Sequence, residues 1–435
     1  MRNVPTACLL AASLLGAGAL PLPLGLPGVG MARADDQACL PLLEQAQGLL
    51  AEAEQATRQG LEAKAQGIAI RGLALLDRAG QLCPDNSDVA GRGVLLAAFA
   101  GNVDRGLAWL ERFTALSRLG ERDPRVHYLR AVVEVRLIGR PDQGVRSLER
   151  MQALEPGLHA EQRDLLYYEA LLGSAALLGV EGRHAEALRL QQAAEALARR
   201  SGKQARARRA RALAGRTLAA DERHGEAAEL FRSLRAEEPA NPAWPYHLGL
   251  MLAQLLNYDE AIDCYRASLQ LQVGWQDRPE VLADLGRARM RLGNCLRLKA
   301  SRLAPGPERE RLVVEAQQQL ERFCSEWPKD ALGPFWLGVL AYEEKDRPLE
   351  ALAHIERAYA LDPDCATTLD YMINAHGRAG GPVPPDQPQP DAAAMAAWQA
   401  RGEAWRTEQA AGAERRKAVL DERARKTGDP SGGCL

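Results

Sequence analysis

The strongest chemical signal in the sequence is a run of basic side chains between Arg199 and Arg216. Residues 196–220 contain no acidic residue. Arginine forms charge-assisted hydrogen bonds with carboxylates and other anions, so Arg206, Arg209 and Arg216 are candidate binding residues for an acidic partner segment. Arg209 and Arg216 are seven residues apart, which places them on one face of a helix. A solvated, arginine-rich outer surface has the same pattern, and the sequence leaves both interpretations open.

Aromatic side chains offer a second candidate surface. Tyr246 and Phe335 each lie near the start of an expected helix, and aromatic anchors are typical of grooves that bind peptides. We expect these two side chains to be exposed. Aromatic residues also pack between helices, which is the interpretation that we favour for Trp336 beside Leu337 and Gly338.

Residue patterns that support catalysis or metal binding are missing from the sequence. It contains no Cys-x-x-Cys, no His-Glu-x-x-His, no Gly-x-Ser-x-Gly and no phosphate-binding glycine loop followed by Lys and Ser or Thr. The acidic pairs at 237–238 and 343–344 are interpreted as solvated helix ends rather than acid–base pairs. The sequence therefore predicts no enzyme, no metal and no cofactor.

A repeated pattern defines the elements that must position these residues. A small residue is followed four and seven positions later by residues that are mostly apolar, and the pattern occurs eight times. Spacings of four and seven place the three side chains on one helix face. Of the seven intervals between neighbouring copies, three are 34, 34 and 35 residues, a period typical of helical arrays. The small residues are Gly72, Gly106, Gly144, Ala187, Ala227, Ala261, Ala316 and Ala351.

With these repeats the chain resembles the tetratricopeptide repeat (TPR) family over roughly residues 38–365. The clearest copies pair Leu248-Gly249 with Ala261, and Leu337-Gly338 with Ala351. The chain departs from the family pattern in its early glycines, in Gln191 at an apolar position, and in long intervals near the middle. The resemblance implies an all-α fold, a right-handed α-α superhelix forming a solenoid of about eight helix-turn-helix units over residues 35–378.

The resemblance also implies a function. First helices of TPR arrays line a concave groove, so we expect a non-catalytic protein–protein interaction scaffold that holds a protein or peptide segment, acidic in character if the basic run is used. Two alternatives stay open: a structural envelope component that oligomerises, and an enzyme or ligand-binding protein with its site in the groove. The net charge of −2 gives no general attraction to nucleic acid.

Residues 1–34 have the features of a secretion signal. Arg2 supplies the positive end, residues 7–20 form an uncharged and largely apolar run, and small residues flank Arg33. We expect cleavage after Ala34 and a periplasmic or other bacterial cell-envelope location. The alternative is a retained membrane anchor, and membrane contact is expected only through the uncleaved signal.

Export makes disulfides plausible for this chain. Cys39 opens the first helix of the first expected unit and Cys83 ends the second, and these two ends are adjacent in an antiparallel helix pair. Cys324 and Cys365 lie near the ends of second helices in successive units, so they form a second candidate pair. The alternative is that these cysteines are small buried apolar residues.

The C-terminal part is expected to leave the solenoid. Prolines between residues 379 and 390 predict an extended, semi-rigid linker there. Trp398 and Trp405 are seven apart and form a narrow apolar stripe, which we expect to fold back on the solenoid or, alternatively, to dock on a partner. The expected segments are a linker at 379–390, a helix at 391–428 and a flexible tail at 429–435.

Overall fold

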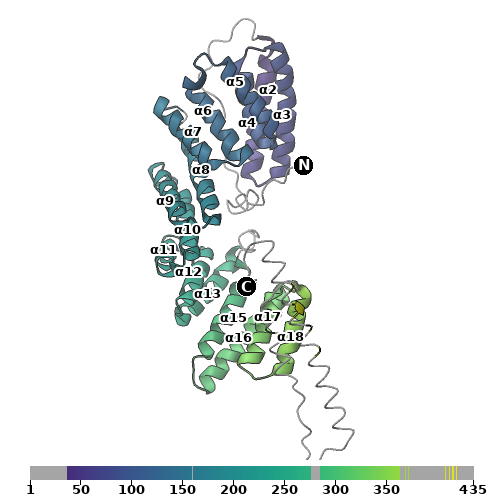
Figure 1. Ribbon diagram of the computed structural model, residues 1–435, viewed down its shortest axis with the longest axis vertical. Helices are drawn as coiled ribbons and strands as arrows, with labels where there is room; N and C mark the ends of the chain where they lie inside the picture. Colours follow the sequence, from purple (N-terminus) through teal and green to yellow (C-terminus); the bar gives the residue numbers. More distant parts are fainter. Residues whose placement is uncertain are drawn as a thin grey trace, which may run out of the picture. The chain divides into compact units, whose positions relative to one another are not determined.

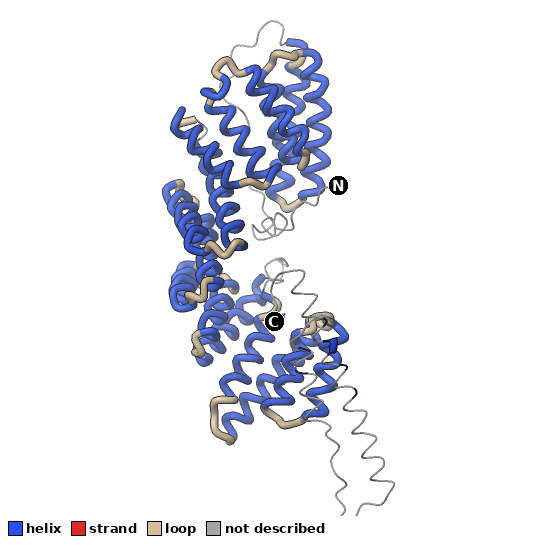
Figure 2. The backbone as a smooth tube through the Cα atoms, in the orientation of Figure 1, coloured by secondary structure: helices blue, strands red, loops and turns tan. Residues whose placement is uncertain are grey.

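The computed structural model describes residues 37–158, 160–275 and 285–362, with a few single residues beyond them. Within these residues the secondary structure is helical and no strand occurs (Figure 2). The predicted all-α, TPR-like solenoid is confirmed. No helix in the described ranges is long and apolar enough to cross a membrane. The expected signal, linker and tail lie outside the described residues, as does nearly all of the expected C-terminal helix.

The helices divide into two units, one ending at Arg223 and the other beginning at His224. In each unit, helices that follow one another in the sequence pack side by side (Figure 1). The first unit contains α2 (Leu40–Arg58), α3 (Glu62–Leu82), α4 (Ser87–Ala100), α5 (Val103–Leu116), η2 (Gly120–Arg122), α6 (Pro124–Val132), η3 (Val133–Ile138), α7 (Pro141–Leu154), α8 (Ala160–Val180), α9 (His184–Arg200) and α10 (Gln204–Ala220). The second contains α11 (His224–Glu237), α12 (Ala243–Gln254), α13 (Tyr258–Gln272), η4 (Val273–Trp275), α15 (Ala288–Ala300), α16 (Pro307–Glu326), α17 (Leu332–Glu343) and α18 (Pro348–Leu361).

The repeated small residue lies at the packed face of a helix in every copy. The eight positions fall in α3, α5, α7, α9, α11, α13, α16 and α18, and all eight are buried. The residues four and seven positions later are buried as well, from 0% exposed for Leu76 to 8% for Leu110. Even Gln191, the polar exception, is only 5% exposed and donates to Thr217 Oγ1 at 2.9 Å. The helical period of the sequence therefore marks the buried face of each of these helices.

Glycine replaces alanine in the early copies because a large side chain fills the space that a Cβ would occupy. A Cβ on Gly72 would lie 2.7 Å from Leu96 Cδ1. In the last copy the glycine lies on the first helix of the pair instead of the second. A Cβ on Gly338 of α17 would lie 3.1 Å from the carbonyl oxygen of Ala351 in α18. In both crossings a glycine leaves the space that the neighbouring helix occupies.

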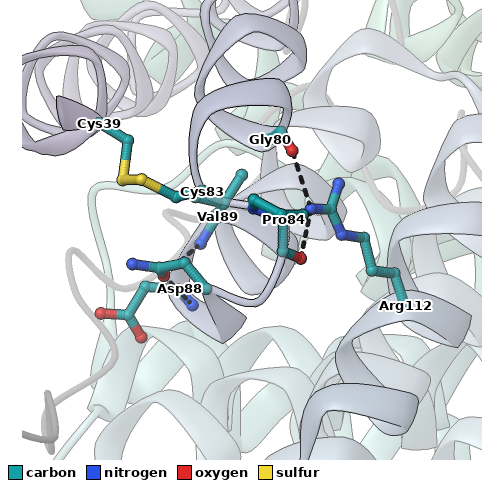
Figure 3. Close-up of a disulfide and its surroundings, with 8 residues drawn as sticks. Cys39, Gly80, Cys83, Pro84, Asp88, Val89 and Arg112 are labelled. Carbon is teal, nitrogen blue, oxygen red and sulfur yellow. Dashed lines mark hydrogen bonds between the residues drawn. A yellow bond between two sulfur atoms is a disulfide. The ribbon is translucent and has the colours of Figure 1, made fainter. Parts of the chain in front are cut away.

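A disulfide closes the first helix pair. Cys39 immediately precedes α2, Cys83 immediately follows α3, and the bond joins them with their Cα atoms 6.1 Å apart (Figure 3). Arg112 of α5 donates from Nη2 to the carbonyl oxygens of Gly80 at 3.1 Å and Pro84 at 2.7 Å. The turn after α3 is therefore tied to α2 by a covalent bond and to α5 by a guanidinium group.

The second candidate disulfide, Cys324–Cys365, stays a prediction, because one of its two cysteines lies outside the described residues. Cys324 is a free, buried thiol near the end of α16, and Cys365 lies outside the described residues. The Cys324 sulfur faces Gly333 of α17, where a Cβ would come within 2.6 Å of it. It fills the crossing of α16 and α17, which is the small buried apolar role that was the alternative interpretation.

Candidate functional site

The basic run occupies α10 and the end of α9. Ala207 and Ala210 of α10 pack into the same apolar cluster as Leu197 of α9 and Leu171 of α8. This packing turns the intervening arginines away from the cluster. Arg206 and Arg209 are partly buried, whereas Arg216 is exposed.

Acidic side chains from α8 and α9 neutralise part of the basic run. Lys203 Nζ lies 2.9 Å from Glu161 Oε1, and Arg199 Nη2 lies 2.7 Å from Glu195 Oε1. Within the described part of the chain, Arg200, Arg206, Arg209 and Arg216 have no ion-pair partner. The basic run therefore carries less unpaired positive charge than the sequence indicates, and that charge lies on these four arginines.

A cavity of about 270 Å³ lies beside Arg206, between α8 and the turn that joins α9 to α10. Its charged lining consists of Glu161, Asp164, Lys203 and Arg206, and Tyr168 also borders it. These groups are hydrogen-bond donors and acceptors of both signs. They suit a polar peptide segment and include no activated nucleophile.

Tyr168 connects this cavity to the unpaired arginines. Its hydroxyl donates to the carbonyl oxygen of Arg206 at 2.8 Å. Burial raises the pKa of the Tyr168 hydroxyl to about 12, although the nearby guanidinium groups of Arg209 and Arg206 lower it. The hydroxyl therefore stays protonated at neutral pH and fixes the first turn of α10 against α8.

Sequence reasoning missed the acidic side of this cavity. Glu161 and Asp164 lie three residues apart, so they share a helix face, but they precede Lys203 by 42 and 39 residues. Only the packing of α8 against α9 and of α9 against α10 brings them together. The spacing of the two acids was the one local signal for this site.

The two aromatic candidates are buried, so the expectation that they are exposed is wrong. Tyr246 is 7% exposed and Phe335 is 1% exposed. Tyr246 packs edge-on against Tyr265 with ring centroids 6.1 Å apart, and Phe335 packs in the same way against Trp336 at 5.1 Å. Both residues sit in helices that contact neighbouring helices on more than one side, so the rings fill the interior.

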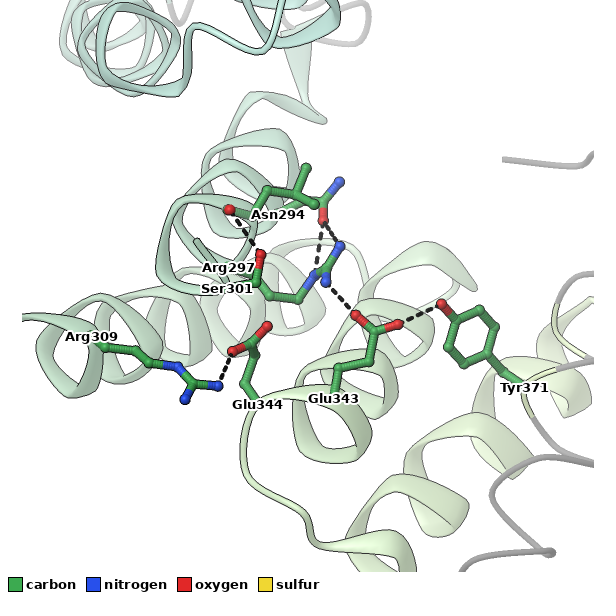
Figure 4. A network of polar contacts seen from close by, with 8 residues as sticks. Asn294, Arg297, Ser301, Arg309, Glu343, Glu344 and Tyr371 are labelled. Carbon is green, nitrogen blue, oxygen red and sulfur yellow. Dashed lines mark hydrogen bonds and ion pairs between the residues drawn. The ribbon is translucent and has the colours of Figure 1, made fainter. Parts of the chain in front are cut away.

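The acidic pair at the end of α17 is part of a polar network rather than a solvated helix end (Figure 4). Arg297 of α15 donates from Nη1 to Glu343 Oε2 at 2.5 Å, and its Nε and Nη2 donate to Asn294 Oδ1. Tyr371 donates its hydroxyl to the other oxygen of Glu343 at 2.8 Å. The side chain of Arg297 is only 8% exposed, which shows that this charge is held inside the unit.

Glu344 is buried more deeply than its neighbour. Its side chain is 2% exposed, and Arg309 at the start of α16 donates to its Oε2 at 2.9 Å (Figure 4). A buried carboxylate requires such a partner, because an unpaired charge would lose its hydration without compensation. The two glutamates therefore tie α17 to α15 and α16.

No group of three or more His, Cys, Asp and Glu side chains able to hold a metal ion occurs among the described residues.

Comparison with known proteins shows the fold. The structure resembles the apo form of RapI, with a TM-score of 0.51 at 8% sequence identity, over 85% of this chain and 98% of that one. The C-terminal part of a TPR repeat-containing protein from Cytophaga hutchinsonii gives a TM-score of 0.44 at 14% identity, over 65% of this chain and 99% of that one. A chain of the APC/C hetero-tetramer Cut9–Hcn1 gives 0.40 at 16% identity, over 86% of this chain, which spans 63% of that chain. No protein-family model and no curated protein matches the sequence.

Proposed function

We propose that this TPR-like solenoid is a non-catalytic protein–protein interaction scaffold of the bacterial cell envelope that binds a partner segment beside α10. The observation that carries the proposal is the pair Arg209 and Arg216, which lie seven residues apart on α10 and have no ion-pair partner in the described part of the chain. Seven residues of helix correspond to about 10 Å along its axis. A partner segment with two carboxylates at that separation would meet both guanidinium groups.

The export part of the proposal rests on two observations. The N-terminal sequence has the pattern of a secretion signal. The Cys39–Cys83 disulfide is typical of proteins in an oxidising compartment such as the periplasm, where such bonds form and persist. Detection of the mature chain in a periplasmic fraction, with an N-terminus at Asp35, tests this part.

Affinity capture from envelope extracts tests the binding surface. We expect the Arg209→Glu/Arg216→Glu double variant to recover at least about ten-fold less partner than the wild type, because two charge-assisted contacts become repulsive. The matched control is Arg71→Glu/Arg78→Glu, which changes two exposed arginines seven residues apart on α3. Capture of the same partners in equal amount by wild type and the α10 variant would disprove the proposed binding surface.

The same preparations distinguish the alternatives. A change in molecular size on removal of residues 381–435 would favour an oligomeric envelope component. Saturable turnover of a small molecule by the purified chain would show that the protein is an enzyme, contrary to the scaffold proposal.

A further inference from the structure

The second unit contains a cavity of about 540 Å³ between α11 and α13, separate from the α10 surface. Ala236, Pro239 and Leu248 give it an apolar lining, and Cys264 borders it. The volume is within the range of about 300–1,000 Å³ that is usual for small-ligand sites. No residue of this cavity belongs to the candidate residues discussed above.

The two arginines that line the cavity differ in their partners. Arg232 is held by two carboxylates, with Glu229 at 2.6 Å and Glu260 at 3.0 Å. Arg235 contacts the Cys264 sulfur at 3.6 Å and has no carboxylate partner among the described residues. Arg235 is therefore an exposed guanidinium group that lines the cavity and has no carboxylate partner among the described residues.

The remaining charges restrict the ligand. Glu260 is neutralised by Arg232, and the side chain of Asp263 is 79% exposed and lies 3.8 Å from Arg266. With these carboxylates balanced by Arg232 and Arg266, Arg235 supplies the one unbalanced charge of the lining, and its planar fork matches a single carboxylate. Burial raises the pKa of the Cys264 thiol, so the sulfur is a neutral part of the wall.

We infer that this cavity binds a small apolar carboxylate, with the carboxylate on Arg235 and the apolar body against Ala236, Pro239 and Leu248. The ligand is either a free aliphatic acid or the carboxyl end of a peptide with an apolar last residue, since both present the same chemistry. The site is independent of the proposed binding surface on α10, which lies in the other unit.

Ligand-observed NMR titration of the full chain tests the inference, with hexanoate as the free acid and hexylamine as the control of opposite charge. A short peptide ending in leucine, with a free or an amidated carboxyl group, represents the second source. We expect Arg235→Gln to weaken carboxylate binding at least about ten-fold. The matched control is Arg322→Gln, an exposed arginine of α16 outside the cavity.

A second variant tests the cavity itself. Ala236 is exposed at its wall, so Ala236→Trp fills the space without disturbing a buried residue, and we expect it to abolish binding. Binding of hexanoate identifies a free acid as a sufficient ligand, and binding of the free-carboxyl peptide alone identifies a chain terminus. The inference is overturned if neither carboxylate binds, or if binding is equal in wild type, Arg235→Gln and Ala236→Trp. The Arg209→Glu/Arg216→Glu variant should bind the carboxylate as the wild type does, which separates this test from that of the α10 surface.

Discussion

Arg297 of α15 and Glu343 of α17 form an ion pair that spans 46 residues of sequence, with 2.5 Å between Nη1 and Oε2. The Arg297 guanidinium group also lies over the ring of Trp336, 5.5 Å from its centroid. Two helices that are not neighbours in the sequence are thereby joined through one buried cation. A small change in either partner should therefore affect the stability of the second unit.

We predict that Glu343→Gln lowers the free energy of unfolding by about 2 kcal/mol. The value is below the usual cost of breaking a buried pair, because the Glu343 side chain is 35% exposed and solvent screens part of the charge. Urea denaturation measures the change. The control Glu229→Gln removes a carboxylate that is 74% exposed and should cost less than about 1 kcal/mol. Equal losses in the two variants would contradict a special role for the Arg297–Glu343 pair.

Alanine substitutions at two helical glycines should have opposite effects. Gly72→Ala places a Cβ 2.7 Å from Leu96 Cδ1, and the fully buried Leu96 must shift to make room for it, so we expect a loss of about 1–3 kcal/mol. Gly48→Ala in α2 meets nothing within 4 Å and should stabilise the chain by about 0.5–1 kcal/mol. Thermal and urea denaturation measure both. A neutral Gly72→Ala variant would show that the crossing of α3 and α4 is looser than the structure indicates.

Removal of the Cys39–Cys83 disulfide should destabilise the first unit by about 4 kcal/mol, because the bond constrains a loop with a sequence separation of 44 in the unfolded chain. The measurement compares urea unfolding of wild type with and without dithiothreitol. The Cys39→Ser/Cys83→Ser variant should be insensitive to the reductant. A reductant effect of the same size in that variant would have to come from another source and would disprove the assignment.

Tyr168 should make the free energy of unfolding of the first unit fall at alkaline pH. Its pKa is about 12 in the folded chain and about 10 in the unfolded chain, so the folded state favours the protonated hydroxyl. This contribution is fully present below pH 10 and is lost as the pH rises towards 12. At pH 11 the wild type should lose about 1 kcal/mol more, relative to pH 9, than Tyr168→Phe does. Identical pH profiles for the two proteins would refute the assignment.

The number and kind of helices could be predicted from the sequence because they depend on local patterns. Ala261 and Tyr265 in one copy, and Ala316 and Leu320 in the next, follow the helical period. That period places them on a buried helix face whatever the neighbouring helix is. The Cys39–Cys83 pair was foreseen for a similar reason, since the two ends of an antiparallel pair are adjacent.

Which side chains meet was decided only by the tertiary structure. Tyr246 and Phe335 were expected at the surface because nothing near them in sequence shows that further helices cover them. Glu161 reaches Lys203 across 42 residues, and Glu343 reaches Arg297 across 46. By itself, the sequence determined the all-α repeat architecture and the buried face of each helix, because hydrophobic periodicity is a property of a single helix. The tertiary structure decided which arginines are neutralised and which remain unpaired, because an ion pair depends on side chains that only helix packing brings together.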